Sequence, residues 1–157
     1  MERIPITTAG FEAMKEQVRL LRAIERPKVI RAIAEARAHG DLTENAEYEA
    51  AKDRQAFLER QIGELQHKIA CADVIDPKTV TTDCAVFGCT VVLENLDTEE
   101  EVQYQLVGPD ESDVQQGRIS VSSPVGRAMI GKKVGEEVIV QAPGGTRQYE
   151  LVDIRAS

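Results

Sequence analysis

Between residues 40 and 48 the chain reads Gly40-Asp41-Leu42-Thr43-Glu44-Asn45-Ala46-Glu47-Tyr48. This stretch separates two long segments with heptad-like spacing of apolar residues, so it predicts the turn of a helical hairpin. Gly40 is suited to end the first helix, because glycine tolerates the left-handed conformation found there. The turn therefore presents two carboxylates, those of Asp41 and Glu44, at the end of a long arm.

The segment before the turn is predicted to be a helix that begins with a cap by Thr8. Pro27 is expected to kink or briefly break this helix near Glu25 and Arg26, because proline has no amide hydrogen to donate. Apolar residues recur there at steps of three and four, which is typical of one buried stripe. They are Phe11, Met14, Val18, Leu21, Ile30 and Ile33.

The segment after the turn is expected to be one helix from Thr43 or Glu44 to about Ala72. Because the connection is short, the two helices must lie antiparallel. The second helix has the four-and-three spacing of a coiled-coil seam, carried by Leu58, Ile62, Leu65, Ile69 and Ala72. Close to the turn the hairpin should be slender, because small residues prevail there: Ala34, Ala36, Ala46, Ala50 and Ala51.

After residue 77 the apolar pattern changes to that of strands. Ser123, Pro124 and Gly131 are placed to cap, begin and end one short helix. The predicted fold class is α+β, with an N-terminal antiparallel coiled-coil hairpin over residues 1–76 and a C-terminal antiparallel β-sheet domain over residues 77–157. Strands are expected at 85–93, 102–107, 118–121, 138–141 and 148–152, with hairpin turns at 97–100 and 143–145.

Composition excludes several classes of protein. A net charge of −8 argues against a free-standing nucleic-acid binder, since phosphate binding normally leaves a basic footprint. Aromatic residues make up only 4% of the chain, which argues against a base-stacking platform. The three cysteines form no CxxC pair, so reduced thiols and a cytoplasmic location are expected. No signal peptide or membrane-spanning segment is predicted, and no membrane partner.

The charge is unevenly spread along the chain. Residues 77–157 carry 7 Lys and Arg against 13 Asp and Glu, a net of −6, whereas basic residues prevail within 15–37. There Arg19, Arg22 and Arg26 recur at helical spacing. A solvated helix flank is the simple interpretation, and contact with a nucleic-acid backbone is the alternative.

Asp41 and Glu44 admit two interpretations. Asp-x-x-Glu at a helix start is the pattern of a capping box, in which both side chains accept hydrogen bonds from backbone amides. Alternatively, both carboxylates point outward and share Mg²⁺, which prefers oxygen ligands. Two carboxylates cannot fill an octahedral shell, so the second interpretation requires another macromolecule to supply the remaining ligands. The sequence thus argues against a self-sufficient nuclease.

Other residues near the turn also have two interpretations. Arg37 and Lys52 lie one to two turns below it on opposite helices, where they could meet a phosphate together. The alternative is a surface of ion pairs, for example between Lys52 and Asp53. Tyr48 either packs across the hairpin or contacts a partner, and Glu47 is expected to be solvated.

Two sets of motifs then indicate a family. In the hairpin they are 34–37, 39–42, 44–48 and 50–52, and in the second domain they are 119–121, 123–124, 130–132 and 143–145. With these motifs the chain resembles the bacterial Gre transcript-cleavage factors, specifically the GreA type, over essentially its whole length. It departs from them at Thr43, which is often basic in relatives, and at Lys52, where Arg also occurs.

The resemblance implies a mechanism. Gre factors insert the hairpin into the secondary channel of RNA polymerase, while a domain similar in fold to FKBP-type isomerases anchors outside. It implies that Asp41 and Glu44 hold a second Mg²⁺, shared with the polymerase and not tightly bound by the free protein. It also implies that Arg37 and Lys52 contact the extruded RNA 3′ end. We accordingly expect Asn45 and Tyr48 to support the tip of a monomeric factor without catalysis of its own.

Three rival functions remain open at this stage. One is a Gre-like inhibitor that plugs the channel, against which the pair Asp41 and Glu44 argues. Another is an isomerase or chaperone, although residues 78–157 offer only Phe87, Tyr104 and Tyr149 for an aromatic pocket. The last is a metal-dependent nuclease that acts alone, which the coordination argument disfavours.

Overall fold

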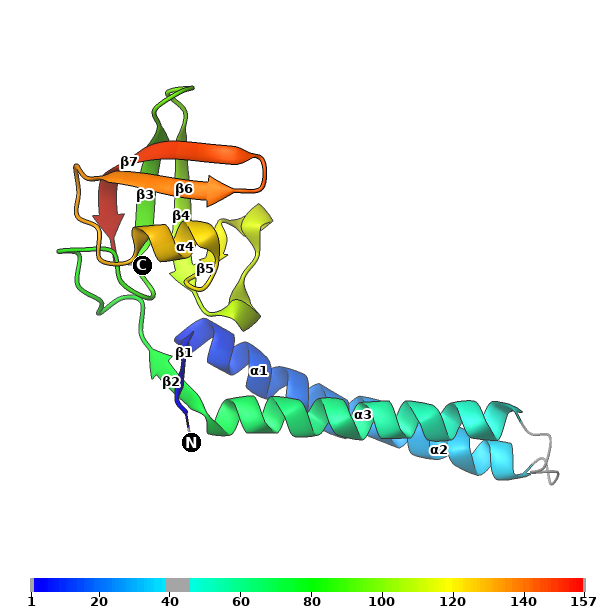
Figure 1. Cartoon of the computed structure of the whole chain (residues 1–157). Coiled ribbons are helices and arrows are strands. Elements are labelled where there is room, and N and C mark those ends of the chain that lie inside the picture. Colours follow the sequence, from blue (N-terminus) through cyan, green and yellow to red (C-terminus); the bar gives the residue numbers. More distant parts are fainter. Residues whose placement is uncertain (1, 39–45, 157) are drawn as a thin grey trace. The chain divides into compact units, whose positions relative to one another are not determined.

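A computed structural model describes residues 2–38 and 46–156, which form two compact units (Figure 1). The helical unit spans Phe11–Cys71. The β unit consists of residues 2–10 together with residues 72–156. A hairpin and a β-rich domain were both predicted, but the boundary differs from the predicted one after residue 76. Both ends of the hairpin run into short strands that group with the β unit.

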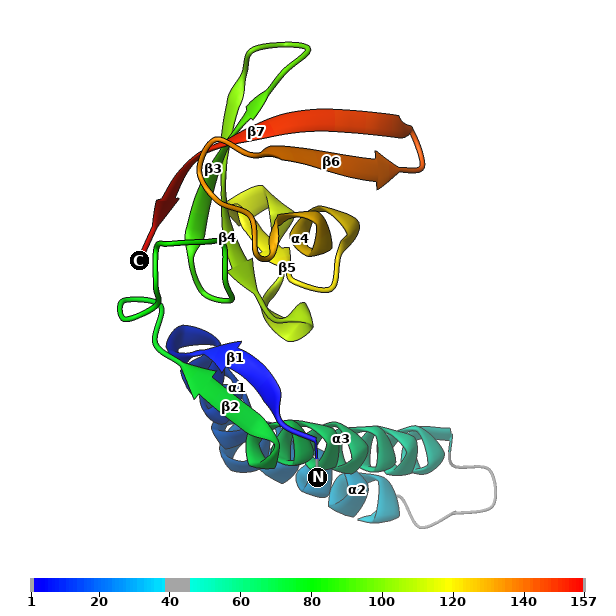
Figure 2. The same ribbon diagram turned by 60° about the vertical axis from the view of Figure 1, so that its left-hand side comes forward.

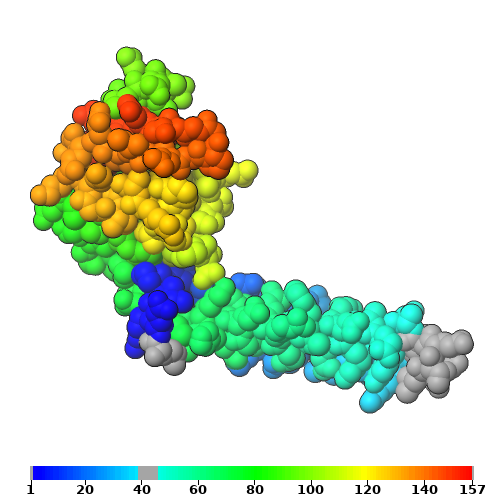
Figure 3. Space-filling view, viewed as in Figure 1, coloured from blue at the N-terminus to red at the C-terminus, as the bar shows by residue number. Residues whose placement is uncertain are grey.

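The hairpin is built from α1 (Thr8–Leu20), η1 (Leu21–Glu25), α2 (Arg26–Ala38) and α3 (Ala46–Ala70). At 1.5 Å per residue, the 25 residues of α3 make it roughly 37 Å long. Helices α2 and α3 lie side by side along the arm, and the space-filling view shows no opening between them on the visible face (Figures 1 and 3). The expected start of the second helix, at Thr43 or Glu44, lies outside the described residues.

The predicted break near Pro27 takes the form of a π-helix. In η1 the Arg26 N–H donates to the Leu21 carbonyl, a step of five residues where an α-helix uses four. The wider turn adds one residue and thereby moves the buried stripe by one position. Val29 is consequently buried, at 5% exposure, while Ile30 is 52% exposed. The prediction that Ile30 belongs to the buried stripe was therefore wrong, because Val29 occupies the position that packs with Leu58 and Ile62 after the π-helical turn.

After the π-helical turn, the buried seam between α2 and α3 passes through Val29 instead of Ile30. Val29, Leu58 and Ile62 form a buried cluster, and Leu21 and Ile33 pack against it. Close to the turn the buried residues are Ala36 and Ala51. Since alanine is the smallest side chain with a β-carbon, the two helices can approach closely there, as the alanine-rich sequence predicted.

A parallel pair of short strands was not predicted. β1 (Ile4–Thr7) pairs with β2 (Ala72–Ile75), and this pairing ends α3 at Ala70 instead of Ala72. The expected cap by Thr8 is also corrected, because the Gly10 N–H donates to Thr7 Oγ1 at 3.1 Å. Thr7 thus closes β1 and caps α1, and Thr8 is already helical.

The β unit contains a five-stranded curled sheet in the order β5-β4-β3-β7-β6 (Figure 2). The β3–β4, β3–β7 and β6–β7 pairs are antiparallel, as predicted, whereas β4 and β5 are parallel. The parallel pair is possible because two 3₁₀ turns, η2 (Pro109–Glu111) and η3 (Val114–Gln116), carry the chain back to the start of β5. The strands are β3 (Thr90–Asn95), β4 (Glu101–Val107), β5 (Arg118–Ser120), β6 (Glu137–Ala142) and β7 (Gly145–Arg155).

The core of this unit lies between the sheet and α4 (Pro124–Met129). The helix has the predicted cap, since the Gly126 N–H donates to Ser123 Oγ at 3.1 Å. The first predicted strand starts five residues late, at Thr90, because Gly88 takes a left-handed φ of 89°. Fully buried side chains of the core are Val91, Leu93, Leu106, Met129, Val138 and Leu151.

Candidate functional site at the hairpin tip

Three of the predicted tip residues lie outside the described residues. They are Asp41, Glu44 and Asn45, within the segment 39–45 between the end of α2 at Ala38 and the start of α3 at Ala46. Both interpretations of the two carboxylates, as a capping box and as a partial Mg²⁺ site, therefore remain predictions. The described residues define the helix ends that border them.

Arg37 and Tyr48 meet across the hairpin. The guanidinium carbon of Arg37 lies 5.9 Å from the centroid of the Tyr48 ring, within the range of a cation–π contact. Arg37 is exposed near the end of α2, and Tyr48 is half-buried in the first turn of α3. Tyr48 thus contacts Arg37 across the hairpin, and its contact with a partner stays a prediction.

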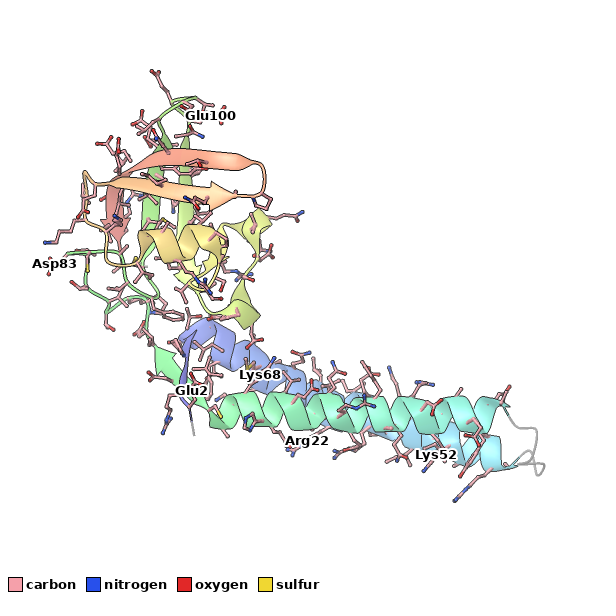
Figure 4. All side chains as sticks on the ribbon, in the orientation of Figure 1. Glu2, Arg22, Lys52, Lys68, Asp83 and Glu100 are labelled. Atoms are coloured by element: carbon pink, nitrogen blue, oxygen red, sulfur yellow. The ribbon has the colours of Figure 1, made fainter. Side chains whose placement is uncertain are left out.

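Lys52 lies on the same flank of the hairpin as this pair. It follows Tyr48 by four residues on α3, and residues at that spacing share one helix face. Its ammonium donates to Gln55 Oε1 at 3.3 Å, and Figure 4 shows it on the part of α3 toward the turn. Within residues 2–38 and 46–156, neither Arg37 nor Lys52 has a carboxylate partner. The predicted pair with Asp53 is therefore absent from this part of the chain.

Basic residues farther from the turn are largely neutralised. Arg26 donates two hydrogen bonds to Glu59, at 2.8 and 2.7 Å, and Arg19 pairs with Glu16 at 2.7 Å. The hydrogen bond from Arg19 lowers the pKa of the Glu16 carboxyl. These ion pairs leave less positive charge for a nucleic-acid backbone than the sequence suggested. Contact of Arg37 and Lys52 with a phosphate stays a prediction.

The outer face of the sheet carries a row of like charges. Glu101, Glu94, Glu150 and Glu137 lie directly opposite one another on β4, β3, β7 and β6. Such a face repels phosphate, which agrees with the net charge of this half of the chain. Among the described residues, no three histidine, cysteine or acidic side chains come together as a metal site.

The aromatic residues of the β unit are mostly used to pack its core. Tyr149 belongs to the core and is 8% exposed, and Tyr104 packs against the same core, where burial raises its pKa. Phe87 is half-buried. Two of the three candidates are thus used to stabilise the fold.

Glu111 is a residue that the sequence analysis did not single out. Its carboxylate accepts hydrogen bonds from the Thr7 and Gly108 amides, more than a hundred residues apart in the chain. The spacing Gly108-Pro109-Asp110-Glu111 is a recognisable capping signal for the 3₁₀ turn, but nothing in it indicates the contact with Thr7.

Fold and site together define a two-part protein, in which a helical hairpin carries the candidate functional residues and a β unit forms a second body. The comparisons agree with this division. Residues 4–74 match the family model "Transcription elongation factor, N-terminal", and residues 80–156 match "Transcription elongation factor, GreA/GreB, C-term". The chain therefore belongs to the GreA/GreB family of transcription elongation factors, which confirms the resemblance seen in its motifs.

Individual relatives match over nearly the whole chain. A transcription elongation factor GreA of Neisseria meningitidis serogroup A is 53% identical over 156 residues, which are 99% of each chain. Its counterpart in Thermodesulfovibrio yellowstonii is 54% identical over 153 residues, covering 98% of this chain and 97% of that one. The crystal structure of GreA factor homolog 1 of Thermus thermophilus aligns over 98% of this chain and 99% of that one, with 26% identity and a TM-score of 0.45. Separately, none of the described helices has the length and apolar character to cross a membrane.

Proposed function

We propose that this protein binds bacterial RNA polymerase, places its hairpin in the secondary channel and stimulates cleavage of backtracked RNA. The observation that carries the proposal is the family match over both units, combined with an acidic stretch, 41–44, between α2 and α3. Cleavage would release a short 3′ fragment and return an arrested complex to elongation. In this role the protein acts as a cytoplasmic monomer and has no independent catalytic site.

The donor chemistry of the tip fits Mg²⁺. Asp41 and Glu44 offer hard carboxylate oxygens, which this ion prefers, but only two residues contribute them. Polymerase, RNA phosphate and water would supply the remaining ligands. When bound, the ion would lower the pKa of a water molecule that attacks the RNA phosphate in line. The task of the hairpin is to bring its two carboxylates to the place where those other ligands already are.

The described flank supports a second task, which is to hold the RNA. Arg37 and Lys52 place two cations on one side of the hairpin, and Tyr48 restricts the Arg37 guanidinium through ring contact. A backtracked RNA 3′ end offers phosphates to such a pair. Asn45, within the tip, is expected to support the arrangement of the two carboxylates.

The proposal is tested with a stalled, backtracked elongation complex that carries 3′-labelled RNA. Addition of the protein and Mg²⁺ should release short labelled fragments, and the protein without polymerase should release none. Fragments released without polymerase would instead indicate a nuclease. Blocked elongation without cleavage would indicate an inhibitor.

Two substitutions separate metal binding from helix capping. Asn caps helices about as well as Asp, and Gln replaces Glu in a capping box. Asp41→Asn and Glu44→Gln therefore keep the cap while they remove the charges that attract Mg²⁺. Both variants should lose cleavage but still compete with the unchanged protein for polymerase. Glu49→Gln, the same change at an exposed position of α3, is the matched control and should cleave normally. Normal cleavage by either tip variant would contradict the shared-metal mechanism.

A further inference from the structure

Phe57 is the exposed aromatic residue of this chain. The sequence holds three phenylalanines and three tyrosines, and all of them except Phe57 are buried or half-buried. Phe57 is 63% exposed in the middle of α3, directly before the buried Leu58. Phenylalanine also favours a helix less than leucine or lysine does. Neither packing nor helix propensity therefore explains an aromatic side chain at this position.

Two arginines flank the Phe57 ring. Arg54 and Arg60 lie three residues before and three residues after it, a spacing that makes side chains neighbours on a helix surface. Both are exposed, and neither has a carboxylate at ion-pair distance within the part of the chain that the structure describes. Among residues 2–38 and 46–156, no cation lies over the Phe57 ring either. Asp53 is the acidic neighbour on this face of α3, so positive charge is in excess there.

This face is not the flank that carries Arg37 and Lys52. Phe57 follows Lys52 by five residues, and at 3.6 residues per turn this spacing is about 140° around the axis of α3. Phe57 also lies roughly 17 Å along that axis from Ala46, the first residue of α3, because the rise is 1.5 Å per residue. Arg54, Phe57 and Arg60, which we name the Phe57 patch, therefore form a separate surface of the arm.

The chemistry of the Phe57 patch fits single-stranded nucleic acid. Every base has a flat π face that stacks on an aromatic ring, and guanidinium groups beside the ring bind the neighbouring phosphates. Isolated apolar side chains are common on protein surfaces and need no partner. An aromatic ring between two available guanidinium groups is more specific, because the charges select an anionic partner. We propose that the Phe57 patch binds single-stranded RNA by stacking one base on Phe57 and holding phosphates with Arg54 and Arg60.

The choice of RNA rests on the proposed function, which brings the arm beside a backtracked transcript. One ring stacks only one base, so the free protein binds RNA weakly, in keeping with its few aromatic residues and its net charge of −8. Beside a transcript that the polymerase already holds, the effective concentration of RNA is high. At a rise of 3.4 Å per nucleotide, about five extruded nucleotides span the roughly 17 Å from the start of α3 to the patch. Only deeply backtracked complexes therefore use it.

A titration of the full chain with RNA tests the contact without polymerase. The probe is a short oligouridylate, added at low salt to isotope-labelled protein and followed by NMR. Amide signals of the Phe57 patch should shift. Phe57→Leu keeps an apolar side chain and favours the helix but loses the π face, so it should weaken binding by about fivefold or more. Phe57→Tyr keeps the ring and should bind RNA as the unchanged protein does.

Charge variants separate phosphate binding from base stacking. Arg54→Gln and Arg60→Gln should each reduce the slope of log affinity against log salt by about 0.7, the value for one phosphate of a single strand. Arg22→Gln removes the same charge from an exposed position of η1 and is the matched control, which should leave the slope unchanged. An abasic phosphate oligomer of equal length should bind more weakly than the oligouridylate. Equal binding of the two oligomers would overturn the stacking role of Phe57.

The role of the patch in the complex is tested by varying the length of the extruded RNA. In complexes backtracked by about ten nucleotides, Phe57→Leu should raise the protein concentration for half-maximal cleavage by about threefold or more. In complexes backtracked by about two nucleotides the RNA does not reach the patch, so the same variant should cleave as the unchanged protein does.

The outcomes distinguish this inference from the proposed function. An equal loss at both lengths would mean that Phe57 contacts the polymerase itself, which would overturn the RNA site. Unshifted amide signals in the titration, together with no loss at either length, would overturn it as well. If the unchanged protein stimulates no cleavage at all, the proposed function fails, while the titration with oligouridylate still decides whether the Phe57 patch binds RNA.

Discussion

Arg26 and Glu59 join α2 to α3 by two parallel hydrogen bonds, of 2.8 and 2.7 Å, directly after the π-helical turn. Arg26 is the residue whose N–H closes that turn on the Leu21 carbonyl. The ion pair therefore joins the two helices at the point where the spacing of the first helix changes. From this pair toward the turn, the residues of α2 that pack against α3 are Val29, Ile33 and Ala36, one position later than an unbroken α-helix would place them.

The shifted register predicts opposite effects at two adjacent residues. Val29→Ala should destabilise the protein by about 1–3 kcal/mol, because it removes buried methyl groups from the cluster with Leu58 and Ile62. Ile30→Ala removes a larger side chain but one that is mostly exposed, so the change should stay within about 0.5 kcal/mol. Urea unfolding followed by circular dichroism measures both. A larger effect at Ile30 than at Val29 would show that Ile30, and not Val29, faces the seam.

The contact between Arg37 and Tyr48 predicts a graded effect on cleavage. Tyr48→Phe keeps the aromatic face and should retain most activity, whereas Tyr48→Leu loses it. An exposed cation–π contact is worth about 0.5–1 kcal/mol, so Tyr48→Leu should reduce the cleavage rate about two- to fivefold. The measurement is the rate of fragment release at saturating protein.

Arg37→Lys offers the control for this prediction. Lysine keeps the charge but loses the planar group that lies over the ring. If stacking positions the cation, Arg37→Lys and Tyr48→Leu should have similar effects, and the double variant should be little worse than either one. Fully additive losses would mean that the two residues act independently.

Much of this architecture could be predicted because local signals and tertiary structure agree. The turn between two heptad-patterned helices, the Ser123 cap of α4 and the β6–β7 hairpin all rest on residues close together in the chain. Such features depend on spacing and on local hydrogen bonding, which the sequence shows directly. The family motifs also predict a role for the tip, and that role stays a prediction.

The features that escaped prediction depend on distant contacts. β1 is a four-residue strand with an exposed Ile4 and a proline, and only its pairing with β2 makes it a strand. Glu111 reads as an ordinary capping residue until the fold brings Thr7 to it. Pro27 indicated that the first helix would be interrupted. Whether the helix would kink or form a wider, π-helical turn depends on the packing of Val29 against α3.

The row of glutamates on the sheet predicts that removal of charge stabilises the β unit. Glu150 lies opposite both Glu137 and Glu94, and like charges at opposite positions repel. Glu150→Gln should therefore raise stability by about 0.2–1 kcal/mol at low salt, and by less at high salt, where repulsion is screened. Glu100→Gln, in the neighbouring turn and outside the row, is the matched control and should change little. Equal effects of the two variants would mean that net charge, and not register, is responsible.

Alkaline pH should destabilise the β unit through one buried and one half-buried group, Cys89 and Tyr104. Desolvation by burial raises the pKa of the Cys89 thiol above its ordinary value of 9.0 and that of the Tyr104 hydroxyl above 10.0. The folded state thus holds these protons more tightly than the unfolded state does. The corresponding stability is fully present below pH 9 and is lost as pH rises through the raised values, because the unfolded chain ionises first. Urea unfolding between pH 7 and 11 should show a decline that begins near pH 9.

Substitutions show which of the two groups, Cys89 or Tyr104, causes each part of the loss of stability at alkaline pH. Cys89→Ala removes the thiol from a fully buried position, so it should lower stability at pH 7 but flatten the first part of the decline. Tyr104→Phe removes the hydroxyl and should flatten the part above pH 10. Because Cys84 is half-buried and close to the surface, Cys84→Ala is the control and should leave the decline near pH 9 largely in place. If Cys84→Ala flattened it as much as Cys89→Ala did, ionisation of the Cys84 thiol would be the cause. Thiol labelling gives an independent measurement, since Cys84 should react with a thiol reagent in the native protein while Cys89 reacts only on unfolding.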